Sequence, residues 1–360
     1  MSDRLFAATR KGLFEFRRDP AAGWSVARTS FMGSPVSMIL PDPRDGTLYA
    51  ALDLGHFGVK LHRSEDGGAS WTEIAAPSYA GIDADAADPP SLKLIWALET
   101  GGPDEPGALW AGTIPGGLFR SEDRGESWSL NRPLWDEPAR AIWFGGGYDK
   151  PGIHSISVDP RDSRRVAIAV SCGGVWETAD GGASWRLGGE GIFSVYTPPD
   201  QAENPAIQDI HRLVRCPAAP DSFWAQHHNG VFRADKGIGE WTHITPSTGD
   251  FGFAVAVHPQ KPGTAWLVPA IKDEYRYPAD GRLIVARTTD GGASFEALGE
   301  GLPQSHAYDL IYRHGLDVDG SGERLAMGST TGGLWFSEDG GDRWTQSEAR
   351  LPPIYAIRFG

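Results

Sequence analysis

The sequence has little cysteine and no long apolar run. Its 360 residues include only two cysteines, Cys172 and Cys216, which are too few for a disulfide framework or for a zinc site built of cysteines. No stretch approaches the roughly 18 consecutive apolar residues that a membrane span needs. The opening "MSDRLFAATRKGLFEF" lacks the apolar segment and cleavage site of a signal peptide. We therefore expect reduced thiols and a cytoplasmic protein that binds no membrane.

Basic stretches are also missing. The chain carries 33 Lys and Arg against 47 Asp and Glu, a net charge of −14 at pH 7. Nucleic-acid binding depends on clustered Lys and Arg that neutralise phosphates, so we expect no nucleic-acid partner. What the chain does have is 47 glycines, 27 prolines and 14 tryptophans, with 40% hydrophobic residues. This composition indicates a packed core and a chain that turns often.

One phrase of eight residues occurs five times. It reads "SEDGGASW" from Ser64 and returns as "SEDRGESW", "TADGGASW", "TTDGGASF" and "SEDGGDRW". Its aspartates are Asp66, Asp123, Asp180, Asp290 and Asp339. The first intervals are 57 residues, and the interval of 110 between Asp180 and Asp290 predicts a degenerate copy, which "RADKGIGEW" supplies. A further degenerate copy, "RRDPAAGW", precedes the first, so we count seven copies.

The sequence around each copy predicts four short strands per repeat. An alternating strand, a Pro turn, a strand, a Gly turn and a third strand precede the phrase, and a Trp-led strand follows it. Units of this size and make-up are typical of β-propeller blades. The C-terminal segment Ile354–Gly360 resembles a lone innermost strand, and Leu5–Thr9 begins a blade that lacks one. We therefore predict an all-β fold over residues 1–360: a single domain, a seven-bladed β-propeller closed by pairing these two segments.

The phrase itself is expected to be structural. Its aspartate can accept hydrogen bonds from backbone N–H groups two residues on, its glycine can take a positive φ, and its tryptophan can bury apolar surface. A catalytic group would need one optimised position, whereas these copies recur around a ring. We expect Asp180→Ala to reduce stability without changing activity.

The phrase resembles the Asp-box, or BNR repeat, of the sialidase superfamily of propellers. The same box occurs in sialidases, two-propeller xyloglucanases, sortilin-type receptors and a photosystem assembly factor. The resemblance covers nearly the whole chain and is specific for fold, but it says little about function. It implies that the ligand-binding mouth lies on the face away from the boxes, at the loops between blades and between second and third strands.

Those loops are uneven in length, and polar and aromatic residues collect in them. The long stretches are 130–156, 191–213 and 269–283. The candidate ligand-binding residues are His56, Trp143, Tyr148, His154, His211, His227, His228, Tyr275, Arg276, Tyr277, His306 and Tyr308. The candidate catalytic carboxyl groups are Asp149, Asp209, Glu274 and Asp309. Convergent polar groups in a concave site predict a small molecule or glycan as ligand.

Three functions stay open at this stage. A glycoside hydrolase needs two carboxyl groups flanking the bond, which the four candidates could supply. It would not be a true sialidase, because the Arg-Ile-Pro sequence that opens that family's arginine triad is missing. A metal-assisted hydrolase or lyase could use His154, His211 and His306, although no metal-binding spacing supports it. The third possibility is a binding or assembly module without chemistry. The sequence identifies no cofactor.

Overall fold

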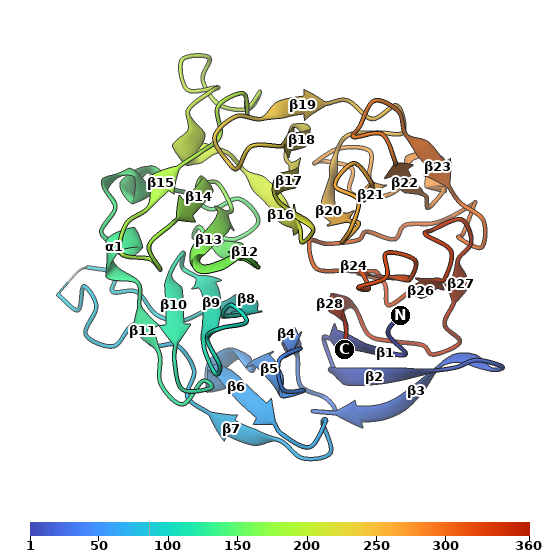
Figure 1. Ribbon diagram of the computed structural model, residues 1–360, viewed down its shortest axis with the longest axis horizontal. Helices are drawn as coiled ribbons and strands as arrows, with labels where there is room; N and C mark the ends of the chain where they lie inside the picture. The colour runs from blue at the N-terminus through green and yellow to red at the C-terminus, as the bar shows by residue number, and fades with distance from the viewer. Residues whose placement is uncertain (86) are drawn as a thin grey trace. The chain divides into compact units, whose positions relative to one another are not determined.

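The computed structural model describes residues 1–85 and 87–360, and it contains seven four-stranded antiparallel sheets. In each sheet the strands lie in the order of the chain, except that the C-terminal strand joins the first sheet. The sheets are the blades of an all-β, seven-bladed propeller, which confirms the predicted fold class (Figure 1). None of the helices within the described ranges is long and apolar enough to cross a membrane.

The chain divides into two compact units, and the prediction of one domain over 1–360 stays a prediction. Unit 1 comprises Met1–Val36, Glu190–Glu203 and His211–Gly360. Its sheets are β28 (Ile354–Phe359), β1 (Arg4–Thr9), β2 (Gly12–Asp19) and β3 (Gly23–Ser30); β16 (Ile210–Cys216), β17 (Ala219–His227), β18 (Gly230–Ala234) and β19 (Thr242–Ile244); β20 (Gly252–Val257), β21 (Ala265–Pro269), β22 (Val285–Thr288) and β23 (Glu296–Leu298); and β24 (Leu316–Val318), β25 (Leu325–Gly328), β26 (Leu334–Ser337) and β27 (Thr345–Gln346). The 3-10 helix η4 (Ala279–Gly281) lies between β21 and β22.

Unit 2 comprises Ser37–Gly189 and Asn204–Ile210. Its sheets are β4 (Val36–Pro41), β5 (Leu48–Asp53), β6 (Val59–Ser64) and β7 (Thr72–Ile74); β8 (Leu94–Thr100), β9 (Leu109–Ile114), β10 (Leu118–Ser121) and β11 (Ser129–Leu130); and β12 (Ile153–Asp159), β13 (Asp162–Val170), β14 (Gly174–Thr178) and β15 (Arg186–Leu187). Its helices are η1 (Gly55–Phe57), α1 (Arg132–Trp135), η2 (Pro138–Ile142) and η3 (Pro205–Ile207).

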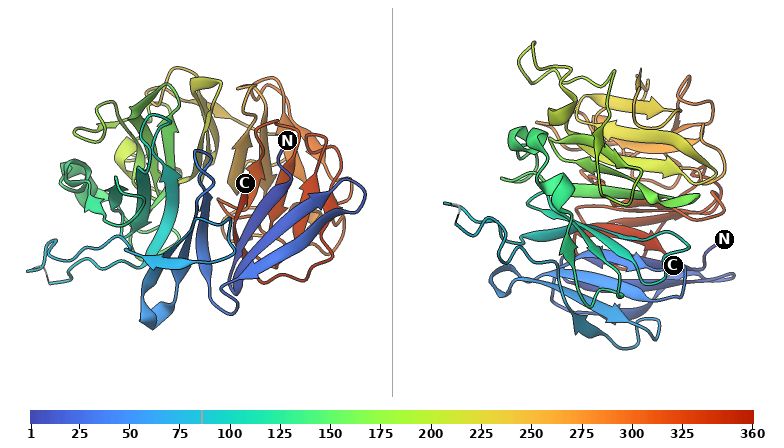
Figure 2. Two further views of the ribbon diagram at one scale, coloured as in Figure 1. Left: turned by 60° about the horizontal axis from the view of Figure 1, so that its bottom comes forward. Right: turned by 60° about the vertical axis from the view of Figure 1, so that its left-hand side comes forward.

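The ring closes as predicted, within the first sheet of unit 1. β28 pairs antiparallel with β1 from Leu5 opposite Phe359 to Thr9 opposite Ile354. Figure 2 shows β28 beside β1, with the long β2–β3 hairpin continuing the same sheet outward. The closing strand is part of the core, because Ile354 and Ile357 are buried among side chains of β1, β2 and β26.

Each of the five full phrases forms the turn between the third and fourth strands of a blade. At Asp180, one carboxylate oxygen accepts hydrogen bonds from the Thr178 hydroxyl at 2.7 Å and the Ser184 N–H at 2.9 Å. The other oxygen accepts from the Ser184 hydroxyl at 2.6 Å, and Gly182 takes a φ of 94°. Asp66, Asp123 and Asp290 repeat these bonds. The phrase is therefore a structural turn, although its backbone donor lies four residues after the aspartate rather than the two that we expected.

Two further details of the phrase differ from expectation. The degenerate copies build other turns: Asp19 accepts from the N–H groups of Ala21 and Ala22, both at 2.8 Å. The tryptophans of the full copies are mostly half-buried, because each lies directly before the outermost strand of its blade. The fully buried tryptophans belong to second and third strands instead. They are Trp110, Trp176, Trp224, Trp266 and Trp335.

The box aspartates give the protein a testable dependence on acid. Hydrogen bonds from Ser184 and Thr178 lower the pKa of Asp180 to about 2. Because this pKa lies below the unfolded value near 3.9, the stabilisation is present above about pH 4 and is lost as the pH falls through 2. We expect Asp180→Asn to lower the melting temperature at pH 6, and the difference from the parent to shrink towards pH 2. Asp200→Asn, at an exposed loop, is the control; a difference that does not vary with pH would contradict the assignment.

Neighbouring blades are joined by arginines that the sequence analysis did not single out. The arginine is the penultimate residue of a blade's third strand, and it donates to the carbonyl of the residue after the next blade's box aspartate. We call this contact the arginine bridge. The pairs are Arg63 with Arg124, Arg233 with Gly291 and Arg287 with Gly340, each at 3.0 Å. The bridge gives a turn carbonyl a hydrogen-bond donor from the preceding blade; the Gly340 carbonyl also accepts from Trp266 Nε1 at 2.8 Å.

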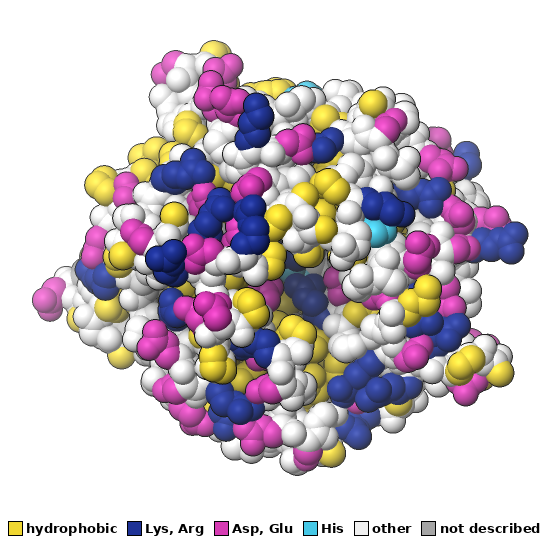
Figure 3. Space-filling view, in the orientation of Figure 1, with side chains coloured by type: hydrophobic (Ala, Val, Ile, Leu, Met, Phe, Trp, Pro, Cys, Tyr) yellow, Lys and Arg dark blue, Asp and Glu magenta, His cyan; other side chains and the backbone are white. Residues whose placement is uncertain are grey.

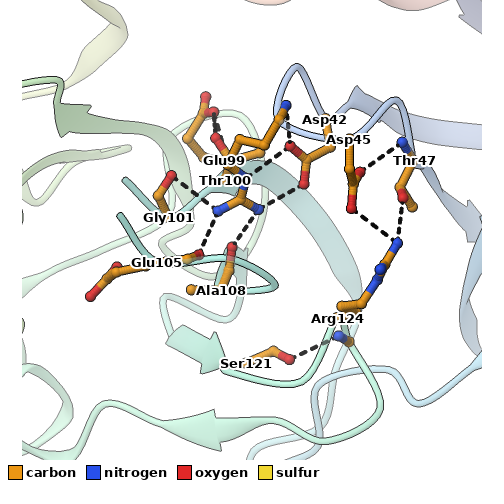
Figure 4. Close-up of polar contacts among 12 residues, drawn as sticks. Asp42, Asp45, Thr47, Glu99, Thr100, Gly101, Glu105, Ala108, Ser121 and Arg124 are labelled. Atoms are coloured by element: carbon orange, nitrogen blue, oxygen red, sulfur yellow. Dashed lines mark hydrogen bonds and ion pairs between the residues drawn. The ribbon is translucent and has the colours of Figure 1, made fainter. Parts of the chain in front are cut away.

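A second arginine contact joins the first two blades of unit 2 (Figure 4). Arg44, in the β4–β5 turn, binds both carboxylate oxygens of Asp42 at 2.9 and 2.7 Å. Its guanidinium also donates to the carbonyls of Glu105 at 2.8 Å and Ala108 at 2.9 Å, in the β8–β9 turn. Asp42 is 3% exposed, so the pair lies largely out of water.

Candidate functional site

Unit 1 brings several of the predicted residues together at one end of its blades. His211 begins the inner strand β16, and His228 lies in the β17–β18 turn. The β21–β22 loop carries Tyr275, Arg276 and Tyr277. This arrangement follows from the meander of each blade, in which the start of the first strand and the second-to-third turn lie at the same end.

Two histidines lie within an aromatic cluster. The ring of His211 stacks on Phe253 at 4.3 Å between centroids, and it contacts the His228 ring at 5.5 Å. The His211 Nδ1 donates to the Gly252 carbonyl at 2.6 Å, because a carbonyl oxygen can only accept. His211 is therefore fixed in orientation by one hydrogen bond and one stacked ring.

Arg276 connects this cluster to the β21–β22 loop. Its guanidinium lies over Phe253, 5.4 Å from the ring centroid, and its Nε donates to Asp273 at 3.0 Å. Burial acts to lower the pKa of Arg276, but hydrogen bonds to Asp273 and Tyr312 raise it overall. Arg276 thus holds the predicted loop against the inner strand β20.

Three tyrosines in contact form what we call the tyrosine surface: Tyr275 and Tyr308, which are exposed, and Tyr277, which is half-buried between them. The centroids of Tyr275 and Tyr277 are 6.5 Å apart, and those of Tyr277 and Tyr308 are 5.9 Å apart. Tyr275 is 50% exposed and Tyr308 is 62% exposed. A backbone hydrogen bond from Ala307 to Gly281 joins the loops that carry them. Contiguous exposed apolar surface often marks a binding site, so this group of rings is a candidate for one.

The candidate carboxyl groups of unit 1 differ in their surroundings. Both the Ser329 hydroxyl, at 2.8 Å, and the Thr331 hydroxyl donate to one oxygen of Asp309, which fixes this half-exposed carboxylate beside Tyr308. Glu274 is exposed, and a backbone N–H together with Lys272 lowers its pKa. Asp309 is held in one orientation, whereas Glu274 is an ordinary surface acid.

The remaining histidines of unit 1 have different environments. His227 is buried, and its Nδ1 accepts from the Asn229 N–H at 2.9 Å, so it shapes the turn that carries His228. His306 is exposed, with a φ of 53° that non-glycine residues rarely adopt. His211 and His228 each offer a ring nitrogen within 4.8 Å of the other, a spacing at which two ligands can share a metal ion. The metal-assisted alternative therefore stays a prediction.

In unit 2, the predicted residues fall into a buried and an exposed group. His154 is fully buried: its Nε2 donates to the Ile210 carbonyl at 2.7 Å, and its Nδ1 lies 3.0 Å from the Ser155 hydroxyl. Asp209 is 5% exposed and accepts from the Ser171 hydroxyl at 3.2 Å. Trp143 is also buried, against Trp176.

The exposed group of unit 2 lies on loops. His56 contacts Phe57 in η1, and Tyr148 packs against Trp96 at 5.2 Å while remaining 50% exposed. Asp149 is exposed next to Tyr148. No carboxyl pair with the geometry of a glycosidase is defined by these placements, so the catalytic assignments stay predictions.

Sequence reasoning missed the apolar half of the unit 1 cluster. Phe251 and Phe253 lie at the start of β20, the position that His211 takes in β16. Tyr196 packs on His228 at 4.7 Å, and Tyr312 packs on Phe253 at 5.1 Å. Position in the repeat would have identified them, because the first residues of every inner strand lie at the same end of the blades, whatever their residue type.

Comparison with known proteins gives a distant relationship. No family model matches the chain. A probable oligoxyloglucan-reducing end-specific xyloglucanase of Neosartorya fischeri is 23% identical over 330 residues, which cover 82% of this chain and 37% of that protein. A xyloglucanase of a Paenibacillus species is 27% identical over 292 residues, which cover 69% of this chain and 26% of that protein. The protein is a propeller distantly related to xyloglucanases. It spans well under half the length of these relatives, and membership of the wider sialidase superfamily stays a prediction.

Solved structures support the fold alone. The GH74 xyloglucanase from Xanthomonas campestris matches with a TM-score of 0.66 at 18% identity, covering 100% of this chain and 52% of that one. YCF48 from Cyanidioschyzon merolae matches with a TM-score of 0.55 at 16% identity, covering 89% and 87%. YCF48 has also been solved bound to D1 peptide. The same fold therefore occurs in a glycan hydrolase and in a peptide-binding protein.

Proposed function

We propose that the protein binds an oligosaccharide on the tyrosine surface of unit 1. The observation that carries the proposal is the series of ring contacts from the exposed Tyr275 through the half-buried Tyr277 to the exposed Tyr308. The C–H bonds on one face of a pyranose ring pack well on an aromatic face, and consecutive rings can accept consecutive sugars. Tyrosine also offers a hydroxyl for the polar edge of a sugar.

Asp309 and Arg276 are the polar partners in this proposal. The Ser329 and Thr331 hydroxyls both donate to the Oδ1 atom of Asp309, and in this proposal its Oδ2 atom accepts sugar hydroxyls. Arg276, fixed by Asp273 and Phe253, contributes donors next to Tyr275 and Tyr277. A few oriented polar groups beside an apolar surface are the usual composition of a ligand site.

The relatives support a glycan as the ligand class. The two curated relatives are named for action on xyloglucan or its oligosaccharides. We therefore choose xyloglucan oligosaccharides as the first ligands to test. The proposal is limited to binding, because glycoside hydrolysis needs two positioned carboxyl groups, and of the two unit 1 candidates only Asp309 is held in one orientation.

The tyrosine surface predicts a specific loss of binding. We expect Tyr275→Ala and Tyr308→Ala each to weaken the binding of a xyloglucan heptasaccharide by about threefold to tenfold, the range for losing one aromatic stacking contact. Isothermal titration calorimetry measures the affinities, and a reducing-end assay on the same samples reports any hydrolysis.

The matched control is Tyr148→Ala, because Tyr148 has the same 50% exposure as Tyr275 but lies in unit 2. We expect this variant to bind like the parent. Equal losses in all three variants would show that the tyrosine surface is not a distinct site. Unchanged affinity in Tyr275→Ala and Tyr308→Ala would overturn the proposal.

A further inference from the structure

The outermost strand of the closing blade is much longer than those of the other blades. β3 has eight residues, whereas β7, β11, β15, β19, β23 and β27 have two or three each. β3 lies at the end of its sheet, in the order β28-β1-β2-β3. Along an edge strand, every second residue turns its N–H and C=O groups away from the sheet.

The edge of β3 is open to solvent. All five residues from Ser25 to Thr29 are exposed. The pairing with β2 shifts by one residue at Ala27, between Val26 opposite Phe16 and Arg28 opposite Glu15. Such a bulge increases the local twist, which disfavours pairing with another rigid, flat edge but can be followed by a flexible extended segment.

Basic side chains flank this edge. Figure 3 shows Lys and Arg side chains gathered over the β2–β3 part of the sheet. The side chains of Arg17 and Arg28 are 52% and 41% exposed, and both lie near the same carboxylate, that of Glu15. Arg17 lies directly across from Ser25, whose side chain is small, so its guanidinium can reach a residue added beyond β3.

We propose that β3 is a docking edge for an extended acidic segment of a partner protein, which would add a fifth strand to the closing blade. Main-chain hydrogen bonds to β3 would supply affinity, and carboxylates at alternate positions would meet Arg17 and Arg28. Charge decides between this occupant and a second copy of the chain. A second copy would bring the same two arginines and a net charge of −14 to the edge, whereas an acidic segment complements the arginines at short range.

The probe is an N-acetylated, C-amidated octapeptide in which glutamate and valine alternate. The control peptide has lysine in place of each glutamate. Hydrogen exchange by mass spectrometry reports protection, and fluorescence anisotropy of the labelled peptides reports affinity. We expect the acidic peptide to slow exchange in Gly23–Ser30 and not in β19. It should bind about tenfold more tightly than the lysine peptide at low salt, as two exposed ion pairs of ordinary strength predict.

Two arginine variants test whether the preference for the acidic peptide depends on Arg17. We expect Arg17→Gln to weaken the acidic peptide by about twofold to fivefold, the effect of one exposed ion pair, and Arg282→Gln, at an exposed loop arginine elsewhere in unit 1, to change nothing. Melting temperatures of both variants check the fold. The proposal fails if Gly23–Ser30 stays unprotected, if both peptides protect it equally, or if sedimentation shows that self-association gives the same protection without peptide. None of these readouts involves the tyrosine surface, so this proposal and the glycan proposal are tested separately.

Discussion

Removal of residues 354–360 is expected to abolish cooperative folding of unit 1. The deletion takes away the whole of β28, exposing the edge of β1 and the core around Leu5 and Phe14. Ile354 and Ile357 are 1% and 0% exposed, and burying one such side chain is worth about 1.5–3 kcal/mol. Together with the lost strand pairing, this approaches the 5–15 kcal/mol by which a typical domain is stable. Thermal melting followed by tryptophan fluorescence and circular dichroism measures the effect.

A relocated strand provides the control. Gly360 donates to the Arg4 carbonyl, so the end of β28 lies beside the start of β1. Moving the segment "IYAIRFG" to the N-terminus through a short turn therefore creates a hairpin with the same pairing. We expect this variant to melt close to the parent. A deletion variant that melts like the parent would show that the closing strand contributes nothing.

Arg44→Ala is expected to cost about 3–5 kcal/mol of unfolding free energy, the range for removing one partner of a buried ion pair. The substitution leaves the Asp42 carboxylate, which is 3% exposed, without its bidentate partner. It also removes the donors to the Glu105 and Ala108 carbonyls in the next blade. Equilibrium unfolding in urea, fitted with a shared slope, measures the difference.

Arg164→Ala is the matched control for this prediction. Arg164 also binds both oxygens of the aspartate two residues before it, but its side chain is 69% exposed. We expect a cost of about 1 kcal/mol or less, because water replaces an exposed pair. Arg44→Lys should lie in between, since an ammonium group cannot reproduce the forked geometry. Equal costs for Arg44→Ala and Arg164→Ala would contradict the account given for Arg44.

The local parts of the fold could be read from the sequence. The box turns are set by residues within eight positions of one another, and Asp180, Ser184 and Thr178 contact each other as neighbours in the chain. The strand pairing of Ile354 with Thr9 spans the chain, yet it was predictable because the two ends were complementary fragments of one repeat. The period of the repeat therefore predicted a pairing between residues that lie far apart in the chain.

The candidate site was less accessible to prediction. The search for polar loop residues found His211, Arg276 and Tyr308, but it passed over Phe253, whose ring both His211 and Arg276 contact. It also gave no basis for separating His154, which is buried and hydrogen-bonded at both nitrogens, from His306, which is exposed. Burial depends on what the neighbouring blade places opposite a residue, and one blade's sequence does not contain that information.

The arginine bridge has a consequence for how such a chain can change its number of blades. The repeat that contains Arg287 and Gly291 carries both halves of the contact: the arginine near the end of its third strand and the carbonyl of its own box turn. A tandem duplication of that repeat would therefore insert a blade that already has this contact with the blades before and after it. A gene could gain or lose a unit in one step without first evolving a new interface.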